Sequence, residues 1–121
     1  MAVNDQPGDE FGDWFDSLSE DEQGDIFDVV RKLEAKGVAL GFPHCSAVQG
    51  ASEPLRELRP RQGRSPLRPI YAFDLRRDAV LIIGGNKAGN PHFYRRLVPV
   101  AERIWREYLA EQAAGQHEDE E

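Results

Sequence analysis

The sequence of 121 residues contains a single cysteine, Cys45, and only three histidines, which follow no metal-ligand spacing. One cysteine excludes an internal disulfide bond, which is typical of proteins from a reducing cytoplasm, so we expect a cytoplasmic protein. The same scarcity argues against a zinc site, and we expect neither a metal nor a cofactor. Cys45 follows His44, but no orienting group accompanies the pair, which favours a structural cysteine over a nucleophile.

Long apolar runs are also missing. No stretch approaches the roughly 18–20 apolar residues that a membrane span needs. The first ten residues have neither the basic start nor the apolar core of a signal peptide. We therefore expect no membrane partner, and the length predicts one domain with its own core.

Positive charge is nearly absent from both ends of the chain. Residues 1–54 contain three Lys and Arg against twelve Asp and Glu, and residues 108–121 contain none against five. Residues 55–107 contain twelve against five, so a segment of net charge +7 lies within a chain whose total is −7. Concentrated arginine favours phosphate binding, although a solvated surface of uneven charge is the alternative.

Hydrophobic periodicity predicts two helices in the first third of the chain. Phe11, Trp14, Phe15 and Leu18 recur at helical spacing. Ser19 and Glu22 have the spacing of a capping box for a second helix, which Gly37 would end.

The next segments predict a sheet and a last helix. Residues 55–59, 67–74 and 79–85 predict strands of an antiparallel meander. Asn90 followed by Pro91 predicts the start of a helix that packs on the sheet and bends near Pro99. The fold class is therefore α+β, with a three- to four-stranded antiparallel sheet.

The remaining segments are predicted to lie outside regular structure. We expect residues 1–9 to be disordered, residues 38–54 to form a loop, and residues 115–121 to form a mobile acidic tail. Residues 10–114 would then form the folded domain.

Several polar residues of this meander could meet at one phosphate. Arg68 shares a strand face with Ile70, and the glycine-rich loop at residues 84–90 presents Lys87 ahead of a helix N-terminus, where anions bind. His92 and Tyr94 follow at the start of that helix. Arg56 and Arg59 are three residues apart and point to opposite faces, so only one can join Arg68. Each of these residues could also be an ordinary surface or half-buried side chain, and the loop lacks the spacing of a Walker A motif.

Four segments of this region carry a resemblance to a known family. They are Leu-Arg-Glu-Leu-Arg at residues 55–59, Arg-Pro-Ile-Tyr-Ala-Phe-Asp-Leu-Arg-Arg at 68–77, Ala-Val-Leu-Ile-Ile-Gly-Gly-Asn-Lys at 79–87 and Phe-Tyr-Arg-Arg-Leu-Val-Pro-Val-Ala-Glu-Arg at 93–103. Together with the two preceding helices, they resemble the RelE/HigB/ParE superfamily of type II toxins, in particular its phage-derived, HigB-like branch. The likeness spans about residues 10–113.

The resemblance implies a RelE-like fold, related to small microbial ribonucleases, over residues 10–114. It implies a metal-independent endoribonuclease without a cofactor that cuts mRNA on the ribosome, and a cognate helix-turn-helix antitoxin that blocks it. The catalytic residues would be Arg68, Lys87, Tyr94 and, as a weaker match, His92. The residues predicted to contact RNA are Arg56, Arg59, Arg64, Arg95 and Arg96.

Two features of the chain depart from the family. Its members usually open with an apolar strand, which residues 1–8 do not supply, and active ribosome-dependent members are basic. Two alternatives therefore stay open. One is a ParE-like poison of DNA gyrase, and the other is a non-catalytic remnant that binds the antitoxin or RNA.

Overall fold

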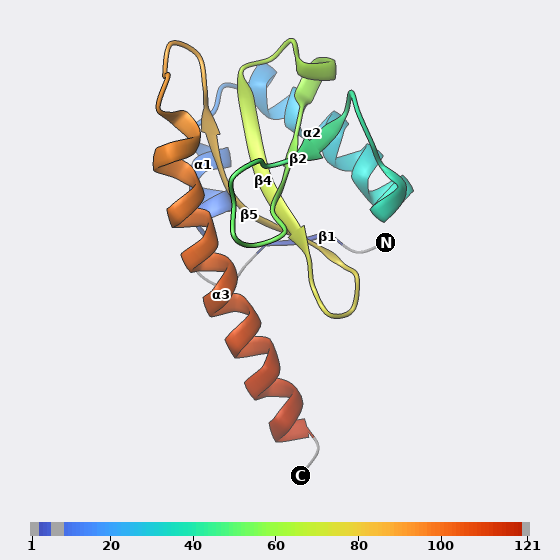
Figure 1. The fold of residues 1–121 in the computed structure, drawn as a ribbon. Helices are drawn as coiled ribbons and strands as arrows, with labels where there is room; N and C mark the ends of the chain where they lie inside the picture. Colours follow the sequence, from blue (N-terminus) through green and yellow to red (C-terminus); the bar gives the residue numbers. More distant parts are fainter. Residues whose placement is uncertain (1–2, 6–8, 120–121) are drawn as a thin grey trace.

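The computed structural model describes residues 3–5 and 9–119, in which helices cover both faces of one sheet (Figure 1). The helices and strands, in chain order, are β1 (Val3–Asp5), α1 (Glu10–Asp16), α2 (Glu20–Lys36), β2 (Cys45–Ala47), β3 (Arg56–Leu58), β4 (Leu67–Phe73), β5 (Ala79–Asn86) and α3 (Phe93–Asp119). Two short 3₁₀ helices, η1 (Gly37–Ala39) and η2 (Pro60–Gly63), follow α2 and β3.

The strand order is β1-β5-β4-β3-β2, and the neighbours from β2 to β5 pair antiparallel. Two N-terminal helices, an antiparallel sheet of four strands and a C-terminal helix confirm the predicted α+β class. Strand β1 adds a parallel partner to β5.

Two strands lie in segments where the sequence predicted none. Strand β2 falls inside the predicted loop at residues 38–54, because Cys-Ser-Ala has little strand propensity of its own and gains its order by pairing with β3. Strand β1 falls inside the segment 1–9 that was predicted to be disordered, and it pairs with the edge of β5. Residues 1–2 and 6–8 of that segment lie outside the described residues.

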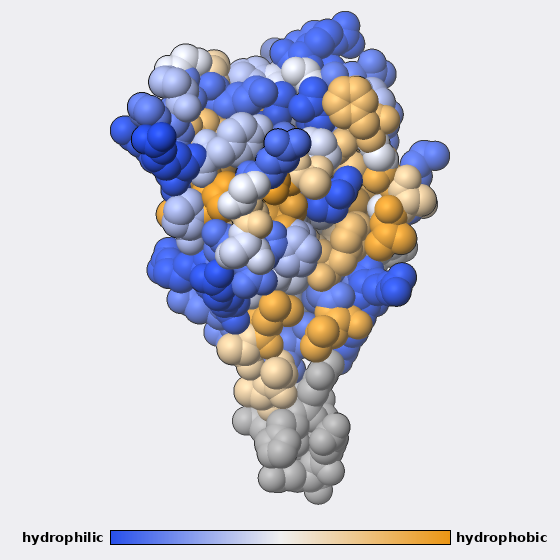
Figure 2. Space-filling model, viewed as in Figure 1, coloured by the Kyte–Doolittle hydropathy of each residue, from blue (hydrophilic) through white to orange (hydrophobic). Residues whose placement is uncertain are grey.

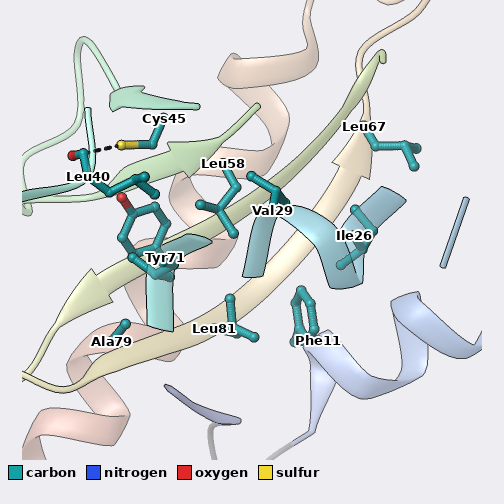
Figure 3. Close-up of a cluster of buried hydrophobic side chains, with 11 residues drawn as sticks. Phe11, Ile26, Val29, Leu40, Cys45, Leu58, Leu67, Tyr71, Ala79 and Leu81 are labelled. Carbon is teal, nitrogen blue, oxygen red and sulfur yellow. Dashed lines mark hydrogen bonds between the residues drawn. The ribbon is translucent and has the colours of Figure 1, made fainter. Parts of the chain in front are cut away.

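The sheet separates two hydrophobic clusters. Helices α1 and α2 pack on one face, where Phe11, Ile26, Val29, Leu58, Leu67, Tyr71 and Leu81 are among the buried side chains (Figure 3). Helix α3 packs on the other face, where Ile70, Ala72, Val80, Ile82, Ala101, Ile104 and Trp105 are buried. The predicted alternation along residues 67–74 therefore places Arg68 on the α3 face, with a register irregularity between Ile70 and Tyr71.

The caps of α2 agree with the sequence. Ser19 Oγ accepts a hydrogen bond from the Glu22 N–H at 3.2 Å, and the Ser19 N–H donates to Glu22 Oε1 at 2.9 Å. This capping box satisfies two N–H groups that would otherwise lack partners. The helix ends at Gly37, whose φ of 56° suits glycine.

Helix α3 begins two residues later than predicted. Asn90 closes a turn, its Oδ1 accepting from the His92 N–H and its carbonyl from the Phe93 N–H, both at 3.2 Å. The helix contains Pro99 and continues to Asp119, beyond the sheet and into the predicted acidic tail, of which residues 120–121 are not described (Figure 1). None of the described helices is long and apolar enough to cross a membrane.

Candidate active site

Gly84 and Gly85, which the sequence analysis assigned to a glycine-rich loop, lie within strand β5, where aromatic side chains pack against them. A Cβ on Gly84 would overlap the Trp14 indole, and one on Gly85 would lie 2.7 Å from Phe93 Cε1. The backbone N–H of Lys87 donates to the Pro66 carbonyl at 3.0 Å, which holds this loop against the start of β4. Aromatic side chains therefore lie beside these two glycines, and an anion bound at this segment stays a prediction.

Polar side chains on the α3 face lie around one buried carboxylate, that of Glu57. Glu57 is 5% exposed, and its Oε2 accepts a hydrogen bond from the Tyr94 hydroxyl at 2.7 Å. Its Oε1 accepts from Ser46 Oγ at 3.2 Å. Arg68 Nε and Arg59 Nη1 each lie 4.0 Å from the same Oε1. Three strands and α3 thus contribute to one cluster around Glu57.

Strand geometry explains why these side chains meet. Glu57 pairs with Ile70 across β3 and β4, and successive side chains of a strand point to opposite faces. Glu57 and Arg59 therefore share the α3 face with Arg68, whereas Arg56 and Leu58 point toward α2. The alternation of side chains along a strand could have identified Glu57 as a site residue, since it lies two residues before Arg59.

Arg68 is almost completely buried, at 1% exposure. Its Nη1 donates to the carbonyls of Ser65 at 2.5 Å and Leu67 at 2.8 Å, and its Nε has no hydrogen-bond partner among the described residues. A buried cation needs a nearby countercharge, and Glu57 supplies it. At this depth Arg68 lies beside Glu57 rather than at the surface, and its role at the phosphate stays a prediction.

Arg59 is the more accessible cation of the cluster, with 21% of its side chain exposed. Its guanidinium carbon lies 5.0 Å from the centre of the Phe42 ring. Gly63 has a φ of 91°, and a Cβ there would lie 2.5 Å from Arg59 Nη2. Glycine at residue 63 therefore suits the positive φ, and a side chain there would displace the head group of Arg59.

Tyr94 is a hydrogen-bond donor at neutral pH. Burial raises the pKa of its hydroxyl to about 12, and the hydrogen bond to Glu57 and the negative charge of that carboxylate act in the same direction. The neutral phenol can therefore orient Glu57, whereas a phenolate that abstracts protons is not available near pH 7.

A cavity of about 360 Å³ opens beside the cluster, and its lining includes Ser46, Gln49, Glu57 and Tyr94. A second cavity of about 320 Å³ shares Gln49 and Tyr94 and adds Arg95. These volumes fall in the range of small-ligand sites. Figure 2 shows this side of the molecule, where hydrophilic surface surrounds smaller hydrophobic patches.

The loop that borders these cavities is fastened to α3. The Ser52 and Glu53 N–H groups donate to Glu102 Oε2 at 2.9 and 3.2 Å. Arg106 Nε donates to Glu53 Oε1 at 2.9 Å. These bonds fix the distance between the wall of the cavity and Tyr94 on α3.

The structure brings together three of the residues predicted for the site, namely Arg59, Arg68 and Tyr94. Arg56 lies on the opposite face, where it donates to the Tyr71 hydroxyl at 3.3 Å and to Cys45 Sγ at 3.4 Å. Cys45 itself is buried, and its thiol donates to the Leu40 carbonyl (Figure 3).

The other predicted residues do not bond to Glu57 in the described part of the chain. Lys87 is half-buried and His92 is exposed, and neither side chain bonds to Glu57 within residues 9–115. Arg64, Arg95 and Arg96 are exposed. Arg96 lines a separate cavity of about 240 Å³ near Asn86 and Asn90.

The amino-acid sequence is similar to one protein family and to two proteins of Mycobacterium tuberculosis. A family model described as "Phage derived protein Gp49-like" matches residues 13–106, which include the whole Glu57 cluster. The chain is 36% identical over 101 residues to "Putative toxin HigB2" of Mycobacterium tuberculosis, covering 81% of this chain and half of that protein. It is 33% identical over 104 residues to "Putative toxin HigB3" of the same organism, covering 84% of this chain and 90% of that protein. No solved structure gives a significant match.

Proposed function

Because the chain belongs to the phage-derived Gp49-like family, we propose that it is the toxin of a type II toxin–antitoxin pair and a metal-independent endoribonuclease that cuts mRNA. The family match and the HigB names of two relatives confirm the HigB-like branch that the sequence predicted. The observation that carries the enzymatic proposal is the Glu57 carboxylate, which lines a cavity and is bonded to Tyr94 and Ser46.

The proposed reaction begins with a ribose 2′-hydroxyl in this cavity. Glu57 accepts the hydroxyl proton as the 2′-oxygen forms a bond to the adjacent phosphorus. The bond from phosphorus to the 5′-oxygen then breaks, and the 5′-oxygen takes a proton from water, leaving a 2′,3′-cyclic phosphate and a 5′-hydroxyl. DNA lacks the attacking group, so only RNA is cut.

The remaining residues of the cluster have separate roles in this proposal. Tyr94 and Ser46 fix the orientation of Glu57 through their hydrogen bonds, and Arg68 supplies a buried countercharge to the Glu57 carboxylate. Arg59 stabilises the additional negative charge on the phosphate, because it is the accessible cation beside the carboxylate. The roles of Lys87 at the phosphate and of His92 at the leaving oxygen stay predictions.

We also propose two partners. The relatives are named as toxins, which supports a cognate antitoxin with a helix-turn-helix domain. The second partner is mRNA on the ribosome, where the exposed Arg64, Arg95 and Arg96 would contact the RNA backbone.

The test is cleavage of a synthetic RNA by the purified chain. Glu57→Gln keeps the shape of the side chain but removes the proton acceptor, so cleavage should fall by about 10²–10⁴-fold. Glu107→Gln, at an exposed position of α3, is the matched control and should cleave normally. A single 2′-deoxy substitution at the cut site should block the reaction.

Two results would contradict the proposal. Glu57→Gln that cuts as fast as the control would remove the assigned base. A wild-type chain that leaves RNA and ribosome-bound mRNA intact, but causes gyrase-dependent DNA breaks on expression, would support the ParE-like alternative instead.

A further inference from the structure

Phe42 is the most exposed of the large hydrophobic side chains in the described part of the chain, at 75%. An aromatic ring in water is unfavourable for the free protein, so its position needs a reason. The ring does not lie on an isolated apolar patch. Arg59 contacts it, at 5.0 Å from its guanidinium carbon to the ring centre.

Arg59 joins this ring to the candidate active site. The same guanidinium lies 4.0 Å from Glu57 Oε1 through its Nη1 atom. Phe42 and Glu57 are therefore separated by the width of one side-chain head group. A base next to a phosphate bound at Arg59 can reach the ring.

The backbone holds Phe42 in place relative to the site. The His44 N–H donates to the Gly41 carbonyl at 3.0 Å, which closes a turn with Phe42 and Pro43 at its centre. The His44 carbonyl then accepts from the Arg59 N–H at 2.8 Å, and Cys45 pairs with Leu58 in the sheet. The ring and the cation that contacts it are thus fixed by main-chain bonds, which lowers the entropy cost of binding.

The segment that contains Arg59 is basic. Arg61 and Arg64 follow Arg59 in and after η2, and both are exposed. Proteins that bind single-stranded nucleic acid combine cations that contact the backbone with aromatic rings on which bases stack. An arginine on one side of the ring adds a cation–π contact and leaves most of the ring open.

We propose that Phe42, supported by Arg59, is a stacking subsite for one nucleobase of single-stranded RNA, beside the linkage that is cut at Glu57. This inference rests on the proposed function for its placement along the RNA. It adds a residue that no sequence pattern indicated. The subsite binds the base by stacking and therefore tolerates any of the four bases.

The test is binding of an RNA oligonucleotide that cannot be cut, with a 2′-deoxy sugar at the cleavage site, measured by fluorescence anisotropy with the full chain. Phe42→Ala should bind about 10-fold more weakly, the loss expected for one stacked base. Phe42→Trp should bind at least as well as wild type. The matched control is Leu75→Ala, which removes an exposed hydrophobic side chain, 68% exposed, from the turn between β4 and β5 and should not change binding.

Abasic nucleotides locate the stacked base. In the wild type, removing the base at one position next to the cut site should weaken binding about as much as Phe42→Ala does. In Phe42→Ala the same abasic RNA should bind no more weakly than the intact RNA, because the interaction is already lost. Thermal unfolding of each variant shows that the fold is kept.

The outcomes separate this inference from the proposed function. Equal binding by Phe42→Ala and wild type would overturn the subsite, even if the wild type cuts RNA. Binding that depends on Phe42 and on one base, by a chain that does not cut RNA, would support the subsite and contradict the nuclease. A wild type that does not bind RNA would overturn both.

Discussion

Each face of the sheet places an arginine next to a tyrosine. On the face covered by α2, Arg56 donates to the hydroxyl of Tyr71, which is 1% exposed. On the face covered by α3, Arg68 and Tyr94 lie around the same carboxylate, Glu57. In both pairs the pKa of the tyrosine is raised, first of all by burial.

The two faces differ in what accompanies the pair. Arg56 has a thiol as its other partner, Cys45, and the surrounding cluster is hydrophobic. Arg68 has a carboxylate that can accept a proton, and that carboxylate lines a cavity. An arginine beside a tyrosine is therefore not sufficient for a site, and the proton acceptor with access to a ligand makes the difference.

The largest predicted effect comes from replacing the two arginines in turn. Arg68→Met leaves Glu57 buried with less countercharge, so it should lower the free energy of unfolding by about 3 kcal/mol and slow RNA cleavage by about 100-fold or more. Arg56→Met should cost about 1 kcal/mol and leave cleavage within about 3-fold of wild type. Urea unfolding and cleavage rates measure both. Equal loss of cleavage in the two variants would mean that RNA cleavage depends on both faces of the sheet.

The next effect compares the paired glycines of β5, one on each face. Gly84→Ala would force a methyl group into the rigid Trp14 indole under α1, and should cost about 3 kcal/mol. Gly85→Ala meets one edge atom of Phe93 at 2.7 Å and a Leu97 methyl group at 3.4 Å, and should cost about 1 kcal/mol.

Urea midpoints with an unchanged slope give these free energies of unfolding. Gly24→Ala serves as a control, since no atom lies within 4 Å of its Cβ position on α2. It should stabilise the protein by about 0.5–1 kcal/mol, because alanine favours helix over glycine. A larger cost for Gly85→Ala than for Gly84→Ala would show that the α3 side is the more tightly packed of the two.

A smaller effect separates the two tyrosines by activity. Tyr94→Phe removes the hydrogen bond that orients Glu57, so kcat/KM for RNA cleavage should fall about 10-fold. Tyr71→Phe changes the other face and should leave kcat/KM unchanged. Single-turnover rates on one RNA distinguish them, and a fall in both variants would point to a general loss of rigidity rather than to the site.

The contrast between the faces also shows what the sequence could predict. The strand alternation placed Arg68 on one face with Ile70 and Ala72, and the capping box and Gly37 predicted the ends of α2, all of which are confirmed. These features depend on local geometry, which residue spacing encodes directly.

The parts that sequence spacing missed depend on contacts between distant segments. Strand β2 forms because β3 offers a partner, and Ser46 reaches Glu57 only through that pairing. The glycine-rich segment was interpreted as a ligand loop, but Gly84 and Gly85 lie within β5 with Trp14 and Phe93 beside them. Phe42 gave no signal, since its contact with Arg59 comes from the turn that the sheet holds in place.

The last and smallest effect concerns alkaline pH, where the two faces should behave alike. Below pH 10, the ordinary pKa of tyrosine, Tyr94 is protonated in both the folded and the unfolded chain, and its contribution to stability is complete. Between about pH 10 and its folded pKa of about 12, the unfolded chain loses the proton first, so the free energy of unfolding falls as the pH rises. Tyr71, whose pKa is also raised, acts in the same direction.

Urea midpoints at pH 8.5 and 10.5 test this behaviour. The wild type should lose stability between the two values, and Tyr94→Phe and Tyr71→Phe should each lose less, because each lacks one phenol that titrates in the unfolded chain. Glu107→Gln should lose as much as the wild type, since no group that titrates in this range has changed. A variant that lacks Tyr94 but loses stability as steeply as wild type would mean that the hydroxyl is not buried against Glu57. The cavity would then border a carboxylate that lacks the Tyr94 hydrogen bond, and the proposed difference between the two faces would be reduced to Arg68 and Ser46.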